Sequence, residues 1–194
     1  MRIIRTAGAA LLIAVSAYEA QGQGRLTVDL RGAVATPTGK VAGAELGTAI
    51  GFGGVVALRL SGSVHAYGGW DWMPFSVDQS FAGNDLTFVE TGYTFGLRLE
   101  RAMRTGGRAA LRLEGGGTYK HVEIENDGGH TVIDSDNSLG FEVGAGLVLP
   151  LGEVLRVTPG LRFRSLSPEF GSGAATTKGT LRYVGLELGF SFLF

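Results

Sequence analysis

The sequence predicts an all-β fold, an eight-stranded antiparallel up-and-down transmembrane β-barrel. Three observations predict it. Apolar and polar residues alternate with a period of two along almost the whole chain, the connections between the alternating segments are long and short in turn, and the chain ends on alternating aromatic residues. A period of two is typical of strands that present two different faces.

The first residues of the chain have the parts of a secretory signal peptide. Two arginines precede a short apolar run over residues 7–17, and small residues suited to cleavage follow. The run is about half of the ~20 residues that a membrane-spanning helix needs, so we prefer a cleaved signal peptide to a helical anchor. We therefore expect residues 1–22 to be a signal peptide, cleaved at a position between Ala17 and Gly22, and residues 23–194 to be an exported barrel.

The alternation divides the exported part into eight expected strands. Their approximate bounds are residues 25–35, 48–60, 62–73, 86–101, 107–122, 138–150, 154–165 and 179–194. Long polar loops are expected at residues 36–47, 74–85, 123–137 and 166–178, and tight connections at 61–62, 102–106 and 151–153. Long loops on one rim and short turns on the other are typical of outer-membrane barrels. With an even number of strands, both ends lie on the short-turn rim, which should face the periplasm.

Each expected strand has one apolar and one polar face, and the last strand shows this clearly. Leu186, Leu188 and Phe190 alternate with Gly185 and Glu187. A soluble barrel of the lipocalin type would turn its apolar face inward and cover its exterior with Lys and Glu. The polar face here consists mostly of Gly, Ser, Thr and Ala with sparse charges, which suits a crowded interior. We therefore expect the apolar face to contact lipid.

Aromatic residues lie towards the ends of the expected apolar faces. Trp70 and Trp72 precede an expected long loop, and Phe190 and Phe192 lie near the short-turn rim. Girdles of aromatic residues at both membrane interfaces are typical of transmembrane barrels. These four residues form the predicted aromatic girdle, and they favour a membrane barrel over a soluble one.

Charged residues of both signs fall on the expected inner face. They are Asp29, Arg31, Arg59, Asp71, Glu90, Arg98, Arg112, Glu114, Lys120, Glu142, Arg156, Arg162, Arg164 and Glu187. Buried charges are tolerated only when they are paired or hydrated, and acids and bases nearly balance here. An eight-stranded barrel is just wide enough for its own side chains to fill it, which disfavours a general porin. We therefore expect a charge-paired network in a largely filled lumen, with a selective conduit as the alternative.

The last strand also carries the most specific motif of the chain. Glu187 is followed by Gly189, Phe192 and the terminal Phe194, in the spacing Glu-x-Gly-x-x-Phe-x-Phe. With this motif and its alternating segments, the chain resembles the small eight-stranded outer-membrane β-barrels of Gram-negative-type bacteria, the OmpA/OmpX/OmpW-like group, over residues 23–194. The resemblance implies that these four residues are an assembly signal for the outer-membrane barrel assembly machinery. It implies no catalytic activity.

Some eight-stranded barrels that resemble this one modify lipid A with a His, a Ser and an acid. The histidines are His65, on the inner face near the short-turn rim, His121, on the outward parity, and His130, in the longest loop. His130 has Asp134 and Ser135 nearby in the sequence, but a loop does not hold such groups within the hydrogen-bond reach that catalysis needs. No catalytic residue is predicted, and a lipid A-modifying enzyme stays an alternative.

The longest loop is acidic. Its carboxylates are Glu123, Glu125, Asp127, Asp134 and Asp136, and the segment at residues 134–138 resembles the start of a calcium loop. A calcium loop has Gly at its sixth position, where this chain has Leu139. We therefore interpret the segment as a solvated acidic loop and predict no metal site. A loose cation-bridging role at the lipopolysaccharide surface stays open.

Composition narrows the function classes further. The chain has no cysteine, which excludes disulfides and thiolate metal sites, and its net charge of −1 gives no electrostatic basis for binding nucleic acid. We therefore predict a non-enzymatic integral protein of the cell outer membrane, without a cofactor, which contributes to envelope structure or surface interaction through four long extracellular loops. The expected partners are outer-membrane lipid, lipopolysaccharide and, during biogenesis, the barrel assembly machinery. A narrow channel for small or hydrophobic solutes is a further alternative.

Overall fold

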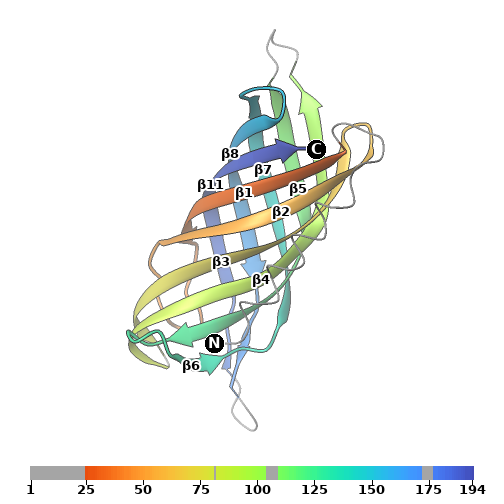
Figure 1. The fold of residues 1–194 in the computed structure, drawn as a ribbon. Coiled ribbons are helices and arrows are strands. Elements are labelled where there is room, and N and C mark those ends of the chain that lie inside the picture. The colour runs from red at the N-terminus through yellow and green to blue at the C-terminus, as the bar shows by residue number, and fades with distance from the viewer. Residues whose placement is uncertain (1–24, 81, 104–108, 172–176) are drawn as a thin grey trace.

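The computed structural model describes residues 25–80, 82–103, 109–171 and 177–194, and the predicted signal peptide lies outside them. The described residues form eleven strands: β1 (Leu26–Pro37), β2 (Ala49–Ser61), β3 (Val64–Ser80), β4 (Gly83–Ala102), β5 (Ala110–Glu125), β6 (Thr131–Asp134), β7 (Ser138–Pro150), β8 (Leu155–Leu166), β9 (Glu169–Phe170), β10 (Thr177–Lys178) and β11 (Leu181–Leu193). Eight of them close into an antiparallel barrel (Figure 1), and the short strands β6, β9 and β10 lie at one end of it. The predicted fold class is therefore confirmed. These residues contain no helix that is long and apolar enough to span a membrane.

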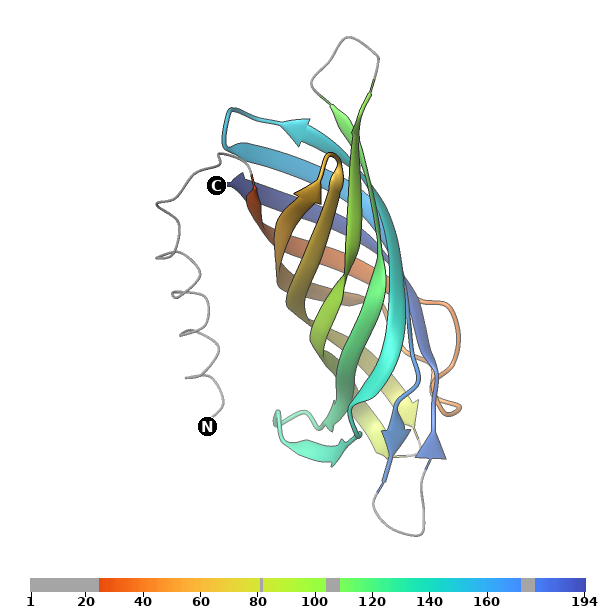
Figure 2. The ribbon, with the colours of Figure 1, turned by 90° about the vertical axis from the view of Figure 1, so that its right-hand side faces the viewer.

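The barrel strands pair in the order β1–β2–β3–β4–β5–β7–β8–β11, and β11 pairs with β1 to close the circle. Asp29 of β1, for example, lies opposite Val55 of β2 on one side and Ser191 of β11 on the other. Figure 2 shows the strands strongly tilted around the barrel axis. Because closure gives each barrel strand two hydrogen-bonded neighbours, the backbone polar groups are satisfied without water.

One of the expected long loops is a continuation of two strands. The prediction of a loop over residues 74–85 is wrong, since β3 and β4 continue to Ser80 and Gly83, which pair with each other. The alternation also continues there, because Phe75 and Phe88 are buried inside the barrel. In the expected long loop over residues 123–137, β6 folds back on the end of β5 as a hairpin. Polar residues between the apolar positions obscure the period of two in these segments.

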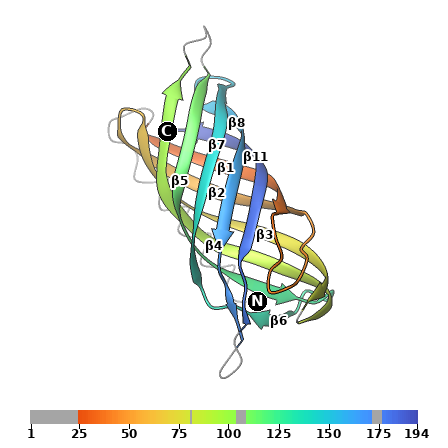
Figure 3. The same ribbon diagram turned by 180° about the vertical axis from the view of Figure 1, so that it is seen from behind.

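The short-turn rim carries both described ends of the chain. The β2–β3 turn has two residues between the paired Ser61 and Val64. Its first residue, Gly62, has a φ of 51°, a left-handed conformation that glycine adopts without steric cost. At the same rim, Leu26 and Phe194 exchange backbone hydrogen bonds of 3.3 and 2.9 Å. Figure 3 shows the β1–β2 connection towards the opposite end, as the alternating loop lengths predict.

The outer surface of the barrel is apolar. Every barrel strand exposes large apolar side chains on this surface, among them Leu30, Ile50, Trp70, Phe95, Leu113, Phe141, Leu161 and Leu186. A soluble protein rarely exposes a continuous apolar face of this extent to water. In a closed barrel, such a face contacts lipid.

The four residues of the predicted aromatic girdle lie on this outer face. Phe190 and Phe192 lie near the short-turn rim. Trp70 and Trp72 lie within β3 and not at its end, because β3 continues beyond them. Their rings pack on Phe52, with ring centroids 6.1 and 5.6 Å from it. Beyond this aromatic cluster, the outward positions of the strands become mostly polar.

The inner face has two regions with different chemistry. Charged side chains occupy the short-turn half and the middle of the barrel. At the loop end, buried apolar residues form what we call the loop-end apolar cluster: Ala35, Val41, Ala44, Ala49, Met73, Phe75, Val77, Leu86, Phe88, Val122, Ile124, Leu166, Phe170, Leu181 and Tyr183. The expectation of a polar inner face along the whole barrel is therefore wrong at this end. The strand extensions carry their own apolar inward positions, which the expected loop boundaries left out.

Candidate functional site

The candidate site is the set of charged side chains that lines the barrel interior, here called the lumen network. Its acids are Asp29, Asp71, Glu90, Glu100, Glu114, Glu142 and Glu187, and its bases are Arg31, Arg98, Arg112, Lys120, Arg156, Arg162 and Arg164. They come from every barrel strand except β2. Residues spaced by two along a strand share one face, so the alternation of the sequence places these charges together.

Asp29 and Glu114 are central acids of the short-turn half. Asp29 accepts hydrogen bonds from Arg31 and Arg112, each of 3.1 Å, and a further one from Arg98. Glu114 accepts hydrogen bonds of 2.8 Å from Arg31 and of 2.7 Å from Arg98. Several charge-assisted hydrogen bonds to one carboxylate offset the free energy that its removal from water costs. With Arg162, which also donates to Glu114, the two acids hold arginines of four strands around them.

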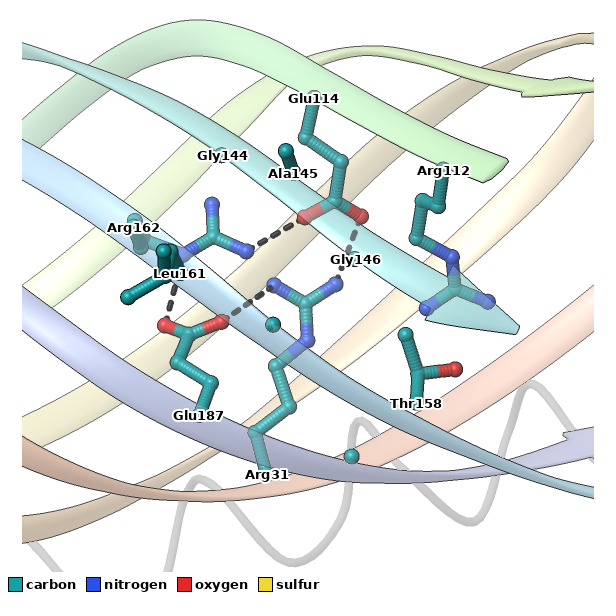
Figure 4. Close-up of a pocket in the computed structure, with 12 residues that line it drawn as sticks. Arg31, Arg112, Glu114, Gly144, Ala145, Gly146, Thr158, Leu161, Arg162 and Glu187 are labelled. Atoms are coloured by element: carbon teal, nitrogen blue, oxygen red, sulfur yellow. Dashed lines mark hydrogen bonds and ion pairs between the residues drawn. The ribbon is translucent and has the colours of Figure 1, made fainter. Parts of the chain in front are cut away.

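Arg162 of β8 connects acids from three other strands. Its guanidinium donates hydrogen bonds to Glu187 at 2.7 Å, to Glu142 at 2.8 Å and to Glu114. Figure 4 shows this guanidinium beside that of Arg31, with both groups between Glu114 and Glu187. Arginine suits such a position because its planar head has five N–H donors in a fixed arrangement. One side chain thus ties β5, β7 and β11 to β8.

The middle of the barrel is organised around Arg164 and Lys120. Arg164 donates hydrogen bonds of 2.7 Å to Glu142 and of 3.0 and 3.1 Å to Asp71. Lys120 donates to Asp71, and its Nζ lies 3.1 Å from Oε1 of Glu90. Lys120 is buried, which lysine tolerates only when it is paired. This half of the network is therefore paired as well.

Two tyrosines complete these contacts, although neither was among the predicted site residues. Tyr67 donates its hydroxyl hydrogen to Glu142 at 2.7 Å, and Tyr183 donates to Glu90 at 2.6 Å. Tyr183 also accepts a hydrogen bond of 2.6 Å from Arg164. Both tyrosines stand an even number of residues from a charge already assigned to the inner face. The period of two could therefore have identified them.

Glu100 is a network acid that was also absent from the predicted set. It accepts hydrogen bonds of 2.9 Å from Arg112 and of 3.2 Å from Arg156 at the short-turn end of the lumen. It follows Arg98 by two positions, so it has the same inward parity. The expected strand over residues 86–101 already contained it, so applying the alternation to the whole of that strand would have found it.

The structure does not place Arg59 in the lumen network, which corrects the prediction. Its side chain is exposed, and no ion pair includes it among the described residues. Arg59 has the inward parity, but it lies at the end of β2, where the pairing with β3 becomes irregular before the turn. Water can solvate a charge there, so no partner is needed.

Two small cavities lie beside residues of the lumen network. The cavity drawn in Figure 4, beside Arg162 and Glu187, has a volume of about 20 Å³. A second cavity, beside Asp71 and Arg164, has a volume of about 30 Å³. A buried water molecule needs ~10–15 Å³ on this measure. Each cavity is therefore large enough for one or two water molecules and too small for an organic solute.

Two connections reach into the loop end of the barrel. Val41 and Ala44 of the β1–β2 connection are buried, and they exchange two backbone hydrogen bonds of 2.9 Å across a two-residue turn. Phe170 of β9 packs on Phe88 of β4, with ring centroids 6.0 Å apart. These three loop residues belong to the loop-end apolar cluster, so the loops and the strands form one apolar layer over the lumen network.

The four residues of the predicted assembly signal divide between the two faces of β11. Glu187 belongs to the lumen network. Gly189 also faces inward, where a Cβ atom would lie 3.8 Å from the Arg31 side chain. Phe192 and Phe194 are exposed on the outer face. Their role as an assembly signal stays a prediction.

The three histidines lie in three separate places. His65 is buried on the inner face near the short-turn rim, and His130 is exposed in the β5–β6 turn. His121 lies on the outer face of β5, with Nε2 3.0 Å from Oε1 of Glu123. In the part of the chain that the structure describes, no hydrogen bond joins a histidine to a Ser or Thr hydroxyl. The described residues therefore hold no preassembled Ser–His pair.

A closed, eight-stranded antiparallel barrel with an apolar exterior and a charged interior is the architecture of the small outer-membrane β-barrel proteins, and this chain has that fold. No protein-family model matches the chain, and no curated protein sequence matches it. Solved structures do match its fold. Neisserial surface protein A (NspA) superposes with a TM-score of 0.56 at 15% identity, over 90% of this chain and 100% of that chain. OprG from Pseudomonas aeruginosa gives 0.60 at 12% identity, over 89% and 97% of the two chains. The outer membrane protein W of E. coli gives 0.59 at 11% identity, over 90% and 100%.

Proposed function

We propose that this chain is a non-enzymatic, integral outer-membrane protein whose lumen is closed, and that it contributes to envelope structure or surface interaction through its extracellular end. The likeness to outer-membrane barrels supports the location, and the apolar outer face supports contact with lipid. The signal peptide predicted for residues 1–22 is consistent with export. In the orientation that we propose for the barrel in the membrane, the short-turn rim faces the periplasm, and the loop-end apolar cluster lies on the outside of the cell.

The observation that carries the proposal is that the lumen contains two successive barriers, one of paired charges and one of apolar side chains. The lumen network crosses the barrel with paired charges, and its two cavities are of the size of water. The loop-end apolar cluster then lies over it, with Val41 and Phe170 brought in by two connections. An ion would have to break ion pairs and then cross an apolar layer, which is costly for a charge.

Electrical recording tests the closed lumen. We expect the refolded protein in a planar lipid bilayer to show no steady single-channel conductance above that of the protein-free bilayer. A steady conductance that changes with Glu142→Gln or Arg162→Met would show that ions pass through the lumen network and would overturn the proposal. Phe141→Leu, on the outer face, is the matched control that should leave any conductance unchanged.

A narrow channel is the second candidate, because the lumen is open at one end. A cavity of about 380 Å³ lies at the short-turn rim. Its lining residues are Ala110, Val148, Pro150, Gly152, Glu153 and Arg156. Arg156, which lines this cavity, is paired with Glu100 of the lumen network, so a channel would also require the lumen network to rearrange. The recording described above separates the two candidates.

The proposed partners are outer-membrane lipid and lipopolysaccharide around the barrel and the barrel assembly machinery during biogenesis. If the terminal residue is part of the assembly signal, Phe194→Ala should lower the amount of folded protein in the outer membrane of an expressing cell. Refolding of the purified variant into detergent should be unaffected, because the Phe194 side chain is half exposed. Heat-modifiable gel mobility measures both. Phe190→Ala removes a similarly exposed ring as the control, and an equal loss of folded protein in cells for both variants would contradict a specific role of the terminal position.

A further inference from the structure

The outer face of the β5–β6 hairpin brings together an imidazole and two carboxylates. His121 and Glu123 stand two residues apart on β5 and therefore share a face, and Glu123 lies directly opposite Asp134 of β6. One ligand atom from each of the three side chains lies within 4.8 Å of the other two. His121 Nε2 and Glu123 Oε1 are already 3.0 Å apart. Three metal-ligating groups from two neighbouring strands thus converge on one point.

The charges of these groups are not balanced by the protein. Like charges directly opposite each other on two strands are destabilising, yet Glu123 and Asp134 occupy such a pair. Among the described residues, no Lys or Arg forms an ion pair with either acid. The site therefore lacks a positive charge of its own beyond what a protonated imidazole would supply.

The backbone under the three side chains is held in place. Ile124 and Ile133 form the neighbouring pair of the same ladder, and both pack on or within the loop-end apolar cluster. Ser135, next to Asp134, accepts a 2.8 Å hydrogen bond at Oγ from the backbone N–H of Val122. These contacts position the hairpin on the barrel, so the three groups project from a strand ladder and not from a loop. A ligand set on regular strands loses little conformational entropy when it binds.

We propose that His121, Glu123 and Asp134 form a binding site for a divalent metal ion of the Zn²⁺ class. One imidazole with two carboxylates is a nitrogen and oxygen donor set that Zn²⁺ accepts, whereas Ca²⁺ and Mg²⁺ prefer oxygen alone. Metal–ligand distances of about 2.1 Å place tetrahedral ligand atoms about 3.4 Å apart. The three ligand atoms lie within 4.8 Å of one another, so side-chain rotations would complete this geometry. The imidazole also distinguishes this set of ligands from the carboxylates of a solvated acidic loop.

The residues of the proposed cation site differ from those that the sequence pattern grouped together. The sequence pattern grouped Asp134 with Asp136 as the start of a calcium loop, but the structure groups Asp134 with two residues of β5. His121 follows the outward and exposed Tyr119 by two positions, just beyond the apolar surface. A metal held by three protein ligands keeps at least one position for water or another ligand. The proposed site would present that position at the level of the lipid headgroups.

Calorimetric titration of the untagged, refolded protein in detergent with ZnCl₂ tests the site. We expect saturable binding of one ion per barrel with a Kd below about 100 μM, and MgCl₂ should not displace the ion. His121→Ala should weaken binding at least about tenfold, and Asp134→Asn should also weaken it.

Two exposed neighbours provide matched controls. His130→Ala removes the histidine of the β5–β6 turn, and Asp136→Asn removes the other acid of the segment that resembles the start of a calcium loop. Both control variants should bind Zn²⁺ like the unaltered protein. Heat-modifiable mobility should show that these two variants, as well as His121→Ala and Asp134→Asn, are folded. Absence of saturable Zn²⁺ binding below about 1 mM would overturn the proposal. Binding that His130→Ala removes and His121→Ala does not would overturn it as well.

Discussion

Arg162→Met should destabilise the folded barrel by about 3–5 kcal/mol, because removal of one partner leaves buried charges without compensation. Arg162 donates hydrogen bonds to Glu187, Glu142 and Glu114. Glu187 depends on it most, since its other ion pair, with Arg31, is 4.0 Å long. Met keeps much of the volume and removes only the charge and the donors. The expected loss of stability therefore measures the contribution of the ion pairs and not the effect of a cavity.

Urea unfolding of the refolded protein, followed by heat-modifiable mobility, measures this loss. Arg59→Met is the matched control, because Arg59 is exposed and has no ion pair among the described residues, and it should change stability by less than about 0.5 kcal/mol. Glu187→Gln should cost less than Arg162→Met, since Arg162 keeps its two other acids. An effect of Arg162→Met as small as that of Arg59→Met would show that the lumen network contributes no net stability.

Leu188→Lys should destabilise the barrel in lipid by about 2–4 kcal/mol, which is the cost of a charge near the middle of the bilayer. Leu188 lies in the middle of the apolar outer face of β11, opposite Gly32 of β1 and Pro159 of β8. Phe192→Lys should cost less, about 0–1 kcal/mol of charge penalty, because Phe192 lies near the short-turn rim, where the lysine head group can reach water.

Refolding of both variants into lipid vesicles, with urea titration, gives the comparison. The same pair in detergent, where the apolar layer is thin and adaptable, should show a smaller difference. If the two lysine variants were equally stable in vesicles, the outer face would not have the depth profile of a bilayer. A protein that stayed soluble and monomeric without detergent would contradict contact with lipid altogether.

The fold was predictable because alternation is a local property. Leu186 and Glu187 must point to opposite faces of any strand that contains them, since the backbone pleat turns each side chain away from its neighbour. Gly62 marks the tight connection between β2 and β3 equally directly. The alternation was missed between Pro74 and Asp85, where polar residues alternate with Phe75 and Val77 and resemble a loop.

The lumen network was predictable as a set but not as pairs. Asp29 and Arg112 are far apart in the sequence, and only the closed barrel brings them to 3.1 Å. The parity of Arg59 is inward, yet its position at a strand end removes it from the lumen. Glu100, Tyr67 and Tyr183 have inward parity too. The two tyrosines were overlooked because the prediction followed charge, and Glu100 was overlooked although the expected strand over residues 86–101 contained it.

The sequence by itself determined the strands, the two faces and the balance of charge inside, because each follows from residue type and a period of two. Only the tertiary structure decided which acid meets which base, since partners depend on the stagger between strands and on closure of β11 on β1. It alone placed Val41 and Phe170 over the lumen network, and it alone brought His121, Glu123 and Asp134 to one point. Contacts of this kind depend on strand pairing, barrel closure and the path of the connections, which the alternation within one strand does not decide.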